Sequence, residues 1–209
     1  MPVNEADAQW LRSNGYRNLC YISWARDSGE QIRKTASACA EDLKKNLKPG
    51  ALPEAVFFDE RMVPGTQWEK EFAPEVCSSL CLVAFCSNHL YQSKWCLSEV
   101  ATMNEHGKRR LGDRHRLIIP VPCWGSPMPP ELGRFQSVED ISARLLRPDP
   151  RFRDKKWYQD LVSALGLAIS ENAQALATAR KAADCVAPLW ISRDPSTEAK
   201  KQFLPFLPL

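Results

Sequence analysis

One glutamate stands out as a residue that could do chemistry. Glu99 lies four residues after Trp95, so both side chains share one stripe of a helix that Ser93 is suited to begin as its N-cap. Directly upstream, the apolar run 80–86 predicts a buried strand. Open α/β sheets bind ligands beyond the carboxyl ends of their strands, and this order of elements delivers a carboxylate to that place.

A second group of candidate residues follows the first expected strand. Residues 16–24 are apolar towards their end and β-prone, and Ser23, Trp24 and Arg26 leave the strand at the same sheet edge as Glu99. The ring of Trp24 or Tyr21 can stack on a base or on nicotinamide, and the guanidinium of Arg26 can bind a pyrophosphate. Three neighbours stay open: of Tyr21 and Ile22 one belongs to the core because strand residues alternate, and Asp27 suits a loop cap as well as a ligand role.

Strand-like and helix-like segments alternate along most of the chain. Strands are expected at 16–24, 55–58, 80–86 and 117–121, with a short edge strand at 135–138. Helices are expected from Ile32 to Leu47, around 68–76, from Ser93 to near Gly107, and from about Asp154 into the 170s. We therefore predict an α/β fold of the flavodoxin-like kind: a central parallel β-sheet of about five strands in the order 2-1-3-4-5, with helices on both faces.

These segments, in this order, resemble the Toll/interleukin receptor (TIR) domain family. The strand 80–86 followed by Trp95-Cys96 and Glu99 resembles the family's Trp-Cys-x-x-Glu segment, 16–27 resembles its first box, and 57–68 resembles its second strand and BB loop. Residues 118–124 and 132–136 resemble its later strands more loosely. The bacterial branch fits better than the receptor branch, because the receptor-type Phe-Trp box is not evident. The resemblance covers about residues 16–170 and implies the TIR fold.

The resemblance also implies an activity. In enzymatic TIR domains the matching glutamate is the catalytic residue of NAD glycohydrolysis, so Glu99 is expected to be catalytic in an NAD+ nucleosidase. Its products would be nicotinamide and ADP-ribose or a cyclic ADP-ribose, with NAD+ as substrate and no cofactor or metal. Nicotinamide departs neutral and needs no proton, so a single carboxylate that stabilises the cationic ribose is chemically sufficient. The alternative for Glu99 is a solvated helix residue.

The expected surroundings of the substrate come from three segments. The residues are Ser23, Trp24, Arg26, Asp59, Trp68 and Trp95. The BB-type loop with Arg61, Met62, Val63, Pro64 and Gly65 is expected to act as a lid and subunit interface, or else to be an ordinary surface turn. The family resemblance implies a homo-oligomer through TIR–TIR contacts, activated by self-assembly in bacterial defence or signalling.

Two other functions compete with this one. A non-catalytic TIR–TIR interaction module would tolerate loss of Glu99 but not of the loop geometry around Pro64-Gly65. A nuclease or cyclic-nucleotide synthase would depend on added nucleic acid or nucleotide. A net charge of +3 makes nucleic acid an unlikely main partner, although 108–116 is rich in Lys and Arg.

Composition bounds the remaining questions. The 209 residues are 44% hydrophobic and 25% charged, as in a soluble globular protein, and they show neither a signal pattern nor an apolar run of the ~20 residues that span a bilayer. Eight cysteines without C-x-x-C spacing predict reduced thiols and no metal site in a cytoplasmic protein. We expect a lead-in at 1–15, the TIR domain at 16–180, and at 181–209 an extension that is a docked tail or a linker to a further module.

Overall fold

The sheet is parallel, and its described strands lie in the order β2-β1-β3-β4. The computed structural model describes residues 4–47, 56–58, 72–113, 115–123, 128, 130–147 and 149–183. The strands are β1 (Asn18–Ser23), β2 (Val56–Phe58), β3 (Ser79–Cys86) and β4 (Ile118–Pro122). Cys20 pairs with Val56 on one side and with Cys81 on the other, and Leu82 pairs with Ile118. This order confirms the predicted flavodoxin-like topology for these four strands.

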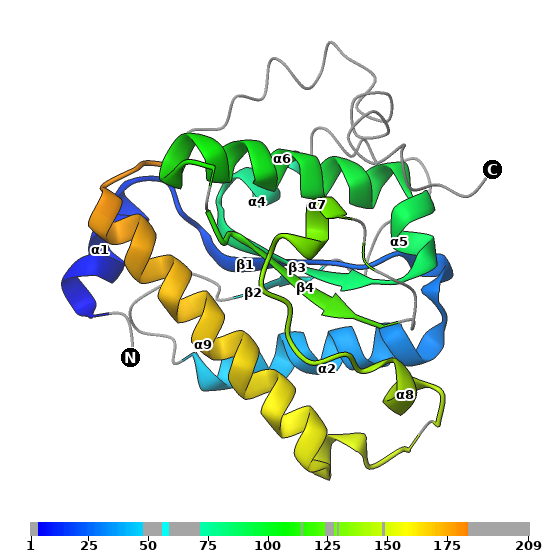
Figure 1. The fold of residues 1–209 in the computed structure, drawn as a ribbon. Coiled ribbons are helices and arrows are strands. Elements are labelled where there is room, and N and C mark those ends of the chain that lie inside the picture. The colour runs from blue at the N-terminus through cyan, green and yellow to red at the C-terminus, as the bar shows by residue number, and fades with distance from the viewer. Residues whose placement is uncertain are drawn as a thin grey trace.

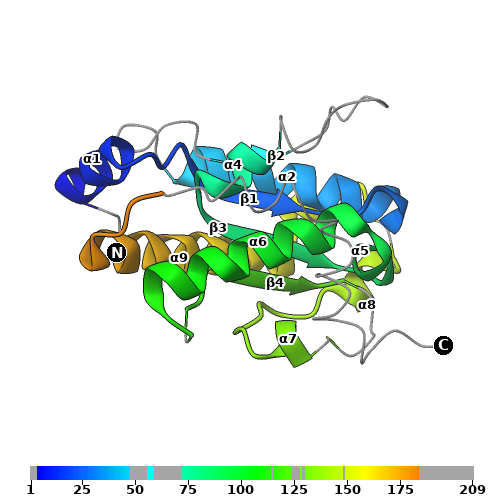
Figure 2. The ribbon, with the colours of Figure 1, turned by 90° about the horizontal axis from the view of Figure 1, so that it is seen from above.

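Helices cover both faces of the sheet. Figure 1 shows α6 (Lys94–Leu111), α4 (Ala73–Cys77) and α5 (Asn88–Gln92) above it, and α2 (Glu30–Asn46) and α9 (Lys156–Ala179) on the opposite face. Seen from above, α6 runs along β3 and β4 (Figure 2). The short elements η1 (Arg26–Ser28), α7 (Pro130–Gly133), α8 (Ser142–Leu145) and η2 (Phe152–Asp154) lie in the connections. Because both faces are covered, every residue of β1 and β3 is buried, which explains their apolar sequences.

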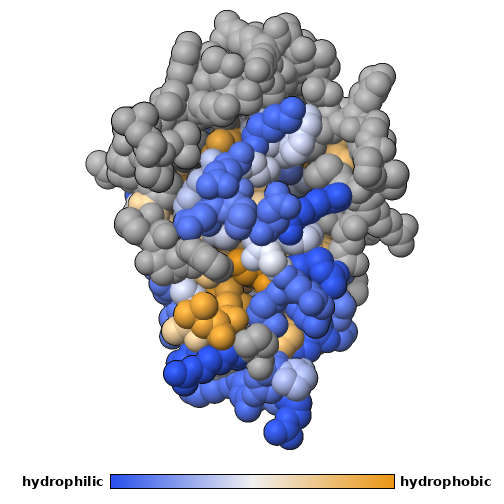
Figure 3. Space-filling view, turned by 90° about the vertical axis from the view of Figure 1, so that its right-hand side faces the viewer, coloured by the Kyte–Doolittle hydropathy of each residue, from blue (hydrophilic) through white to orange (hydrophobic). Residues whose placement is uncertain are grey.

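The carboxyl ends of the neighbouring parallel strands β1 and β3 lie side by side at the same end of the sheet. There β1 leads through η1 into α2, and β3 leads through α5 into α6. The Ser87 and Ser93 hydroxyls cap α5 and α6 by accepting from the amides of Leu90 and Cys96. Figure 3 views the molecule from the side on which these strands end; hydrophilic side chains surround a hydrophobic patch in the lower half of this face.

The predicted edge strand at 135–138 is not a strand. Its backbone follows β4 through two hydrogen bonds, from the Val138 amide to the Pro120 carbonyl (3.1 Å) and from the Ile141 amide to the Pro122 carbonyl (3.0 Å). Pro120 and Pro122 direct their carbonyl groups outward but have no N–H to donate. A regular ladder therefore cannot continue beyond β4 at these positions.

Helix α6 is one turn longer than expected. It continues past Gly107 to Leu111 and ends at Gly112, whose φ of 81° is the left-handed region that favours glycine. Lys108, Arg109 and Arg110 thus belong to the last helical turn rather than to a basic loop, where cations complement the helix dipole.

The expected lead-in at 1–15 contains a helix. Asn4 caps α1 (Glu5–Ser13), which packs on α9 through buried Ala8 and Leu11. Gln174 of α9 donates to the Asp7 carboxylate at 3.0 Å. Of the expected helix around 68–76, the described part is α4 from Ala73. Residues 68–71, Trp68 among them, and residues 184–209 lie outside the described residues.

The expectation of reduced thiols fails at Cys77, which is disulfide-bonded. Disulfides require two Cα atoms within about 7 Å, a proximity that the fold sets and that sequence spacing does not reveal. Six other cysteines are free and buried: Cys20, Cys39, Cys81, Cys86, Cys96 and Cys123. No helix in the described part of the chain is both long enough and apolar enough to span a membrane.

Candidate active site

Glu99 is a buried carboxylate in the second turn of α6. The Ser93 cap starts the helix, and the turn that follows directs Glu99 towards β1, so that its side chain is only 4% exposed. A buried carboxylate needs partners to replace its hydration. Burial also argues against the alternative of a solvated helix glutamate.

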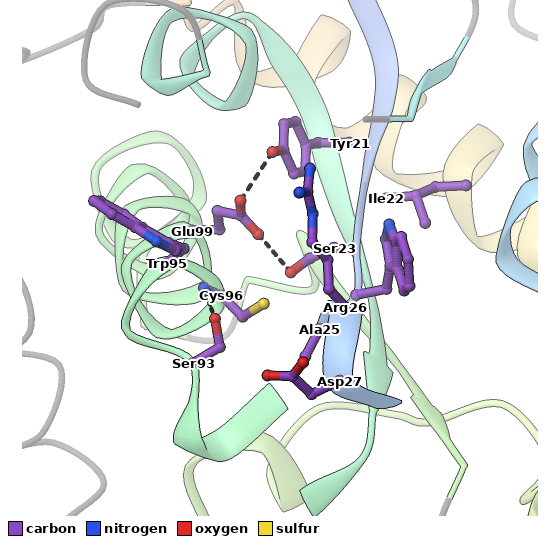
Figure 4. A pocket seen from close by; sticks show the side chains of 11 residues that line it. Tyr21, Ile22, Ser23, Ala25, Arg26, Asp27, Ser93, Trp95, Cys96 and Glu99 are labelled. Atoms are coloured by element: carbon purple, nitrogen blue, oxygen red, sulfur yellow. Dashed lines mark hydrogen bonds between the residues drawn. The ribbon is translucent and has the colours of Figure 1, made fainter. Parts of the chain in front are cut away.

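Two hydroxyl groups from β1 bind the two oxygens of this carboxylate. The Tyr21 hydroxyl donates to Oε1 at 2.9 Å, and the Ser23 hydroxyl donates to Oε2 at 2.5 Å (Figure 4). Tyr21 and Ser23 are two residues apart on a strand and therefore face the same side of the sheet, the side that α6 covers. Hydrogen bonds to a charged acceptor are about twice as strong as neutral ones.

These groups lie in the wall of a pocket of about 210 Å³ between β1, η1 and the start of α6. Its lining residues are Tyr21, Ile22, Ser23, Trp24, Ala25, Arg26, Asp27, Ser93, Trp95, Cys96 and Glu99. The Glu99 carboxylate points from α6 towards β1, while Arg26 and Asp27 come from the segment that follows the strand (Figure 4). Arg26 and Asp27 are exposed, so charged side chains stand at the mouth of a pocket whose inner wall is buried.

Aromatic stacks support the wall on the β2 side. The ring of Tyr21 stacks on Phe57 with centroids 5.2 Å apart, and Phe57 meets the edge of Phe72 at 6.2 Å. Trp24 stacks on Phe58 at 6.0 Å. The two pairs join the active-site end of β1 to β2, which precedes the BB-type loop.

Trp95 is a packing residue at the rim of the pocket. Its half-buried ring packs against the cluster of Phe72 and Ala73, and the Lys94 ammonium lies 4.4 Å from the ring centroid. The ring thereby fixes the first turn of α6 against α4.

Cys96 places a thiol in the pocket wall beside the carboxylate. Burial, with a smaller contribution from the nearby Glu99 charge, raises the pKa of the Cys96 thiol to about 12. The thiol therefore stays protonated at neutral pH, and the protonated form is a weak nucleophile. In the described part of the chain no group of three or more His, Cys, Asp or Glu side chains is arranged to hold a metal ion.

The structure gathers five of the residues predicted from sequence into this pocket: Ser23, Trp24, Arg26, Trp95 and Glu99. The others lie outside the described residues: Asp59, Arg61, Met62, Val63, Pro64, Gly65 and Trp68. Sequence reasoning missed Tyr21 as a hydrogen-bond donor to Glu99. The signal was available in its spacing of two residues from Ser23, which had already been placed at the site.

Comparison with known proteins identifies the family. The family model for the TIR domain matches residues 21–161, more than half of the chain. The protein belongs to the TIR domain family. None of the curated proteins or solved structures compared with the chain gave a match. The match begins at Tyr21 and includes the end of β1, all of β3 and the TIR segment with Glu99, so every residue that lines the described pocket lies inside the family domain. Assignment to the bacterial branch stays a prediction.

Proposed function

We propose that this TIR domain is an NAD+ glycohydrolase, with Glu99 as its catalytic carboxylate. The observation that carries the proposal is the burial of Glu99 in a pocket at the carboxyl edge of the sheet, where two hydroxyl donors hold both of its oxygens. A buried carboxylate with specific partners in a cleft is a candidate functional group on physical grounds. The TIR family includes enzymes of this type, and the family membership supports the same chemistry here.

The reaction breaks the bond between C1′ of the ribose and the pyridinium nitrogen. The bonding electron pair goes to nitrogen, so nicotinamide leaves neutral and the ribose acquires oxocarbenium character. Glu99 stabilises that positive charge and accepts hydrogen bonds from ribose hydroxyls. Water then adds to C1′ and releases one proton, which gives ADP-ribose; attack by a nucleophile of the adenine moiety with loss of a proton gives a cyclic ADP-ribose instead.

The size of the pocket bears on how NAD+ binds. A volume of about 210 Å³ is below the roughly 300–1,000 Å³ of pockets that enclose a whole drug-sized ligand. We therefore place the nicotinamide riboside end beside Glu99 and the pyrophosphate at the mouth, near the exposed guanidinium of Arg26. Trp24 also lines the pocket, and its ring stacks on Phe58.

The experiment that tests the function measures nicotinamide release from NAD+ by the purified protein and by Glu99→Gln. Glutamine keeps the shape and hydrogen-bonding capacity of the side chain but removes the charge that stabilises the ribose cation. We expect release to fall by about 10²–10³-fold, the usual cost of losing one electrostatic stabiliser of the transition state.

Glu105→Gln is the matched control. Glu105 lies on the same helix but is exposed and pairs with Arg109 at 2.9 Å, so its loss is expected to leave release unchanged. Equal release from wild type and Glu99→Gln would mean that Glu99 is not the catalytic residue. No release from folded wild type, with or without added nucleic acid, would favour the TIR–TIR interaction module.

We further propose that the enzyme self-assembles and that assembly raises its activity. TIR domains commonly self-associate, and the pocket lined by the described residues, at about 210 Å³, is too small to enclose a whole dinucleotide. Residues beyond this pocket must then contact the rest of the substrate. The BB-type loop of the same chain or of a second copy is the segment expected to supply them.

A further inference from the structure

The carboxylate of Glu99 is held from the strand side before any substrate arrives. Its Oε1 accepts from Tyr21 and its Oε2 from Ser23, and all three side chains are at most 4% exposed. Two donors on opposite oxygens fix the rotation of a carboxylate as well as its position. A carboxylate has about four lone-pair sites, so these two hydrogen bonds alone do not exhaust its capacity to accept.

We propose that Tyr21 is a positioning residue: its hydroxyl holds Oε1 so that the carboxylate faces the pocket, and it does not contact the substrate. This inference rests on the proposed glycohydrolase function but assigns a residue that neither the TIR resemblance nor the family match assigns. The Tyr21 side chain is 2% exposed, and its ring packs on Phe57, so its hydroxyl reaches Glu99 from inside the core.

The ring of Tyr21 is fixed by its stack on Phe57. Phe57 stacks on it at an interplanar angle of 17°, and the edge-on contact with Phe72 holds Phe57 in turn. A phenol fixed in this way restrains the carboxylate more strongly than a hydroxyl on a mobile side chain would. Support from a second layer of fixed groups is what keeps reacting groups aligned in enzymes.

Other charged and titratable groups near Glu99 also influence its protonation. The pocket wall contributes Arg26 and Asp27 from η1 and the protonated thiol of Cys96 from α6 itself. The two other helices that pack on α6 at this end, α4 and α5, carry Glu75 and His89, which do not line the pocket. Glu75 binds Asn18 and Arg17 instead. Removing the Tyr21 hydroxyl leaves all of these groups in place.

The test compares Tyr21→Phe with wild type in steady-state kinetics and in a carboxyl ¹³C NMR titration of Glu99. Phenylalanine keeps the stack on Phe57 and removes only the donor. We expect kcat to fall about tenfold with KM changed less than about twofold, because the lost bond is to Glu99 and not to substrate. We also expect the Glu99 titration midpoint and the acid limb of the rate profile to rise, since the donor favours the charged carboxylate.

Tyr16→Phe is the matched control. Tyr16 is equally buried, but its hydroxyl donates to the Lys181 carbonyl at 2.8 Å, at the opposite end of β1. We expect it to change stability and leave both kcat and the Glu99 midpoint unchanged. An unchanged midpoint and kcat in folded Tyr21→Phe would overturn the inference, and so would a rise in KM alone, which indicates substrate contact. If wild type releases no nicotinamide, the proposed function fails, while the NMR midpoint still decides whether Tyr21 holds Glu99.

Discussion

Residue 107 is a glycine, and its lack of a side chain leaves room for the ring of His115. A methyl group built on Gly107 would lie 2.1 Å from the His115 Nδ1 atom, far inside van der Waals contact. The ring is held on its other sides by the Asn104 side chain, the Leu117 amide and Phe135, so it cannot move aside freely. The residue type at 107 is therefore decided by packing rather than by helix propensity.

We predict that Gly107→Ala destabilises the protein by about 1–3 kcal/mol, the usual cost of overpacking, although alanine favours helices intrinsically. Urea unfolding at pH 7 measures the change. Gly133→Ala serves as a control, because a methyl group there meets nothing within 4 Å. A folded Gly107→Ala with an unfolding midpoint equal to or above that of wild type would contradict this account of the contact.

At the same scale, sequence predicted where Glu99 lies but not what holds it. Ser93, Trp95 and the preceding strand place the carboxylate at the carboxyl edge through local rules of capping and periodicity. Whether Tyr21 or Ile22 faces that carboxylate depends on which side of β1 the helix α6 covers. That side is set by long-range packing, and once Ser23 is placed at the site, alternation puts Tyr21 beside it.

At the scale of elements, helix α9 contains a glycine, Gly166, at a position where neither the backbone conformation nor the packing requires glycine. Gly166 lies inside the helix with an ordinary φ, and a methyl group there would touch Leu43 and Leu47 of the α2 region at 4.0 Å, a normal contact distance. We predict that Gly166→Ala stabilises the protein by about 0.5–1 kcal/mol, because it removes backbone freedom from the unfolded chain and adds contact area. A lower urea midpoint than wild type would show that α9 and α2 are packed more tightly than these distances indicate.

Helix α6 and the turn after it bury two neutral histidines. Burial, with smaller contributions from neighbouring cations, lowers the pKa of His106 to about 3 and that of His115 to about 4. In His115 the two ring nitrogens have different partners: Nδ1 accepts from the Leu117 amide, so Nε2 carries the proton towards the Asn104 carbonyl oxygen. Protonation of Nδ1 would break the contact with Leu117 at the start of β4.

We predict that these two histidines lower the free energy of unfolding in mild acid. Both folded pKa values lie below the unfolded value of about 6.5, so their contribution is complete above that pH and is lost as pH falls towards 4. At pH 5 the loss is on the order of 1–2 kcal/mol for each histidine. Urea unfolding at pH 7 and pH 5 should show a smaller difference for His106→Asn and His115→Asn than for wild type. Equal differences in all three proteins would mean that other groups govern the acid response.

The prediction of helices and strands failed where a long-range packing partner or a missing backbone N–H group determined the local structure. The segment before Tyr16 contains few apolar residues, so its sequence gives only a weak helix signal. Helix α1 is stabilised by packing on α9, which is far away in sequence, with Ala8 and Leu11 buried. The edge strand after β4 is prevented by Pro120 and Pro122, which cannot donate to it. By contrast, β1 and β3 are buried on both faces, and their continuous apolar runs identified them correctly.

At the scale of the whole molecule, the proposed active site can be completed by the loop of the same chain or by that of a second copy. If a neighbouring copy supplies the loop over the pocket, only assembled protein is active, and mass action makes release per molecule rise with concentration. We predict such a rise over about two orders of magnitude in protein concentration. A constant rate per molecule across that range would indicate that each chain forms a complete site.

Mixing two inactive variants distinguishes the loop of the same chain from that of a second copy. Glu99→Gln lacks the carboxylate, and Trp68→Ala alters the expected loop contact, which lies outside the described residues. If the loop acts across the interface, mixed assemblies contain sites with an intact Glu99 from one copy and an intact Trp68 from the other, and part of the activity returns. If the loop covers the pocket of its own chain, every site in the mixture carries one defect. Recovery that grows with total protein concentration would therefore establish both the assembly and the direction in which the loop acts.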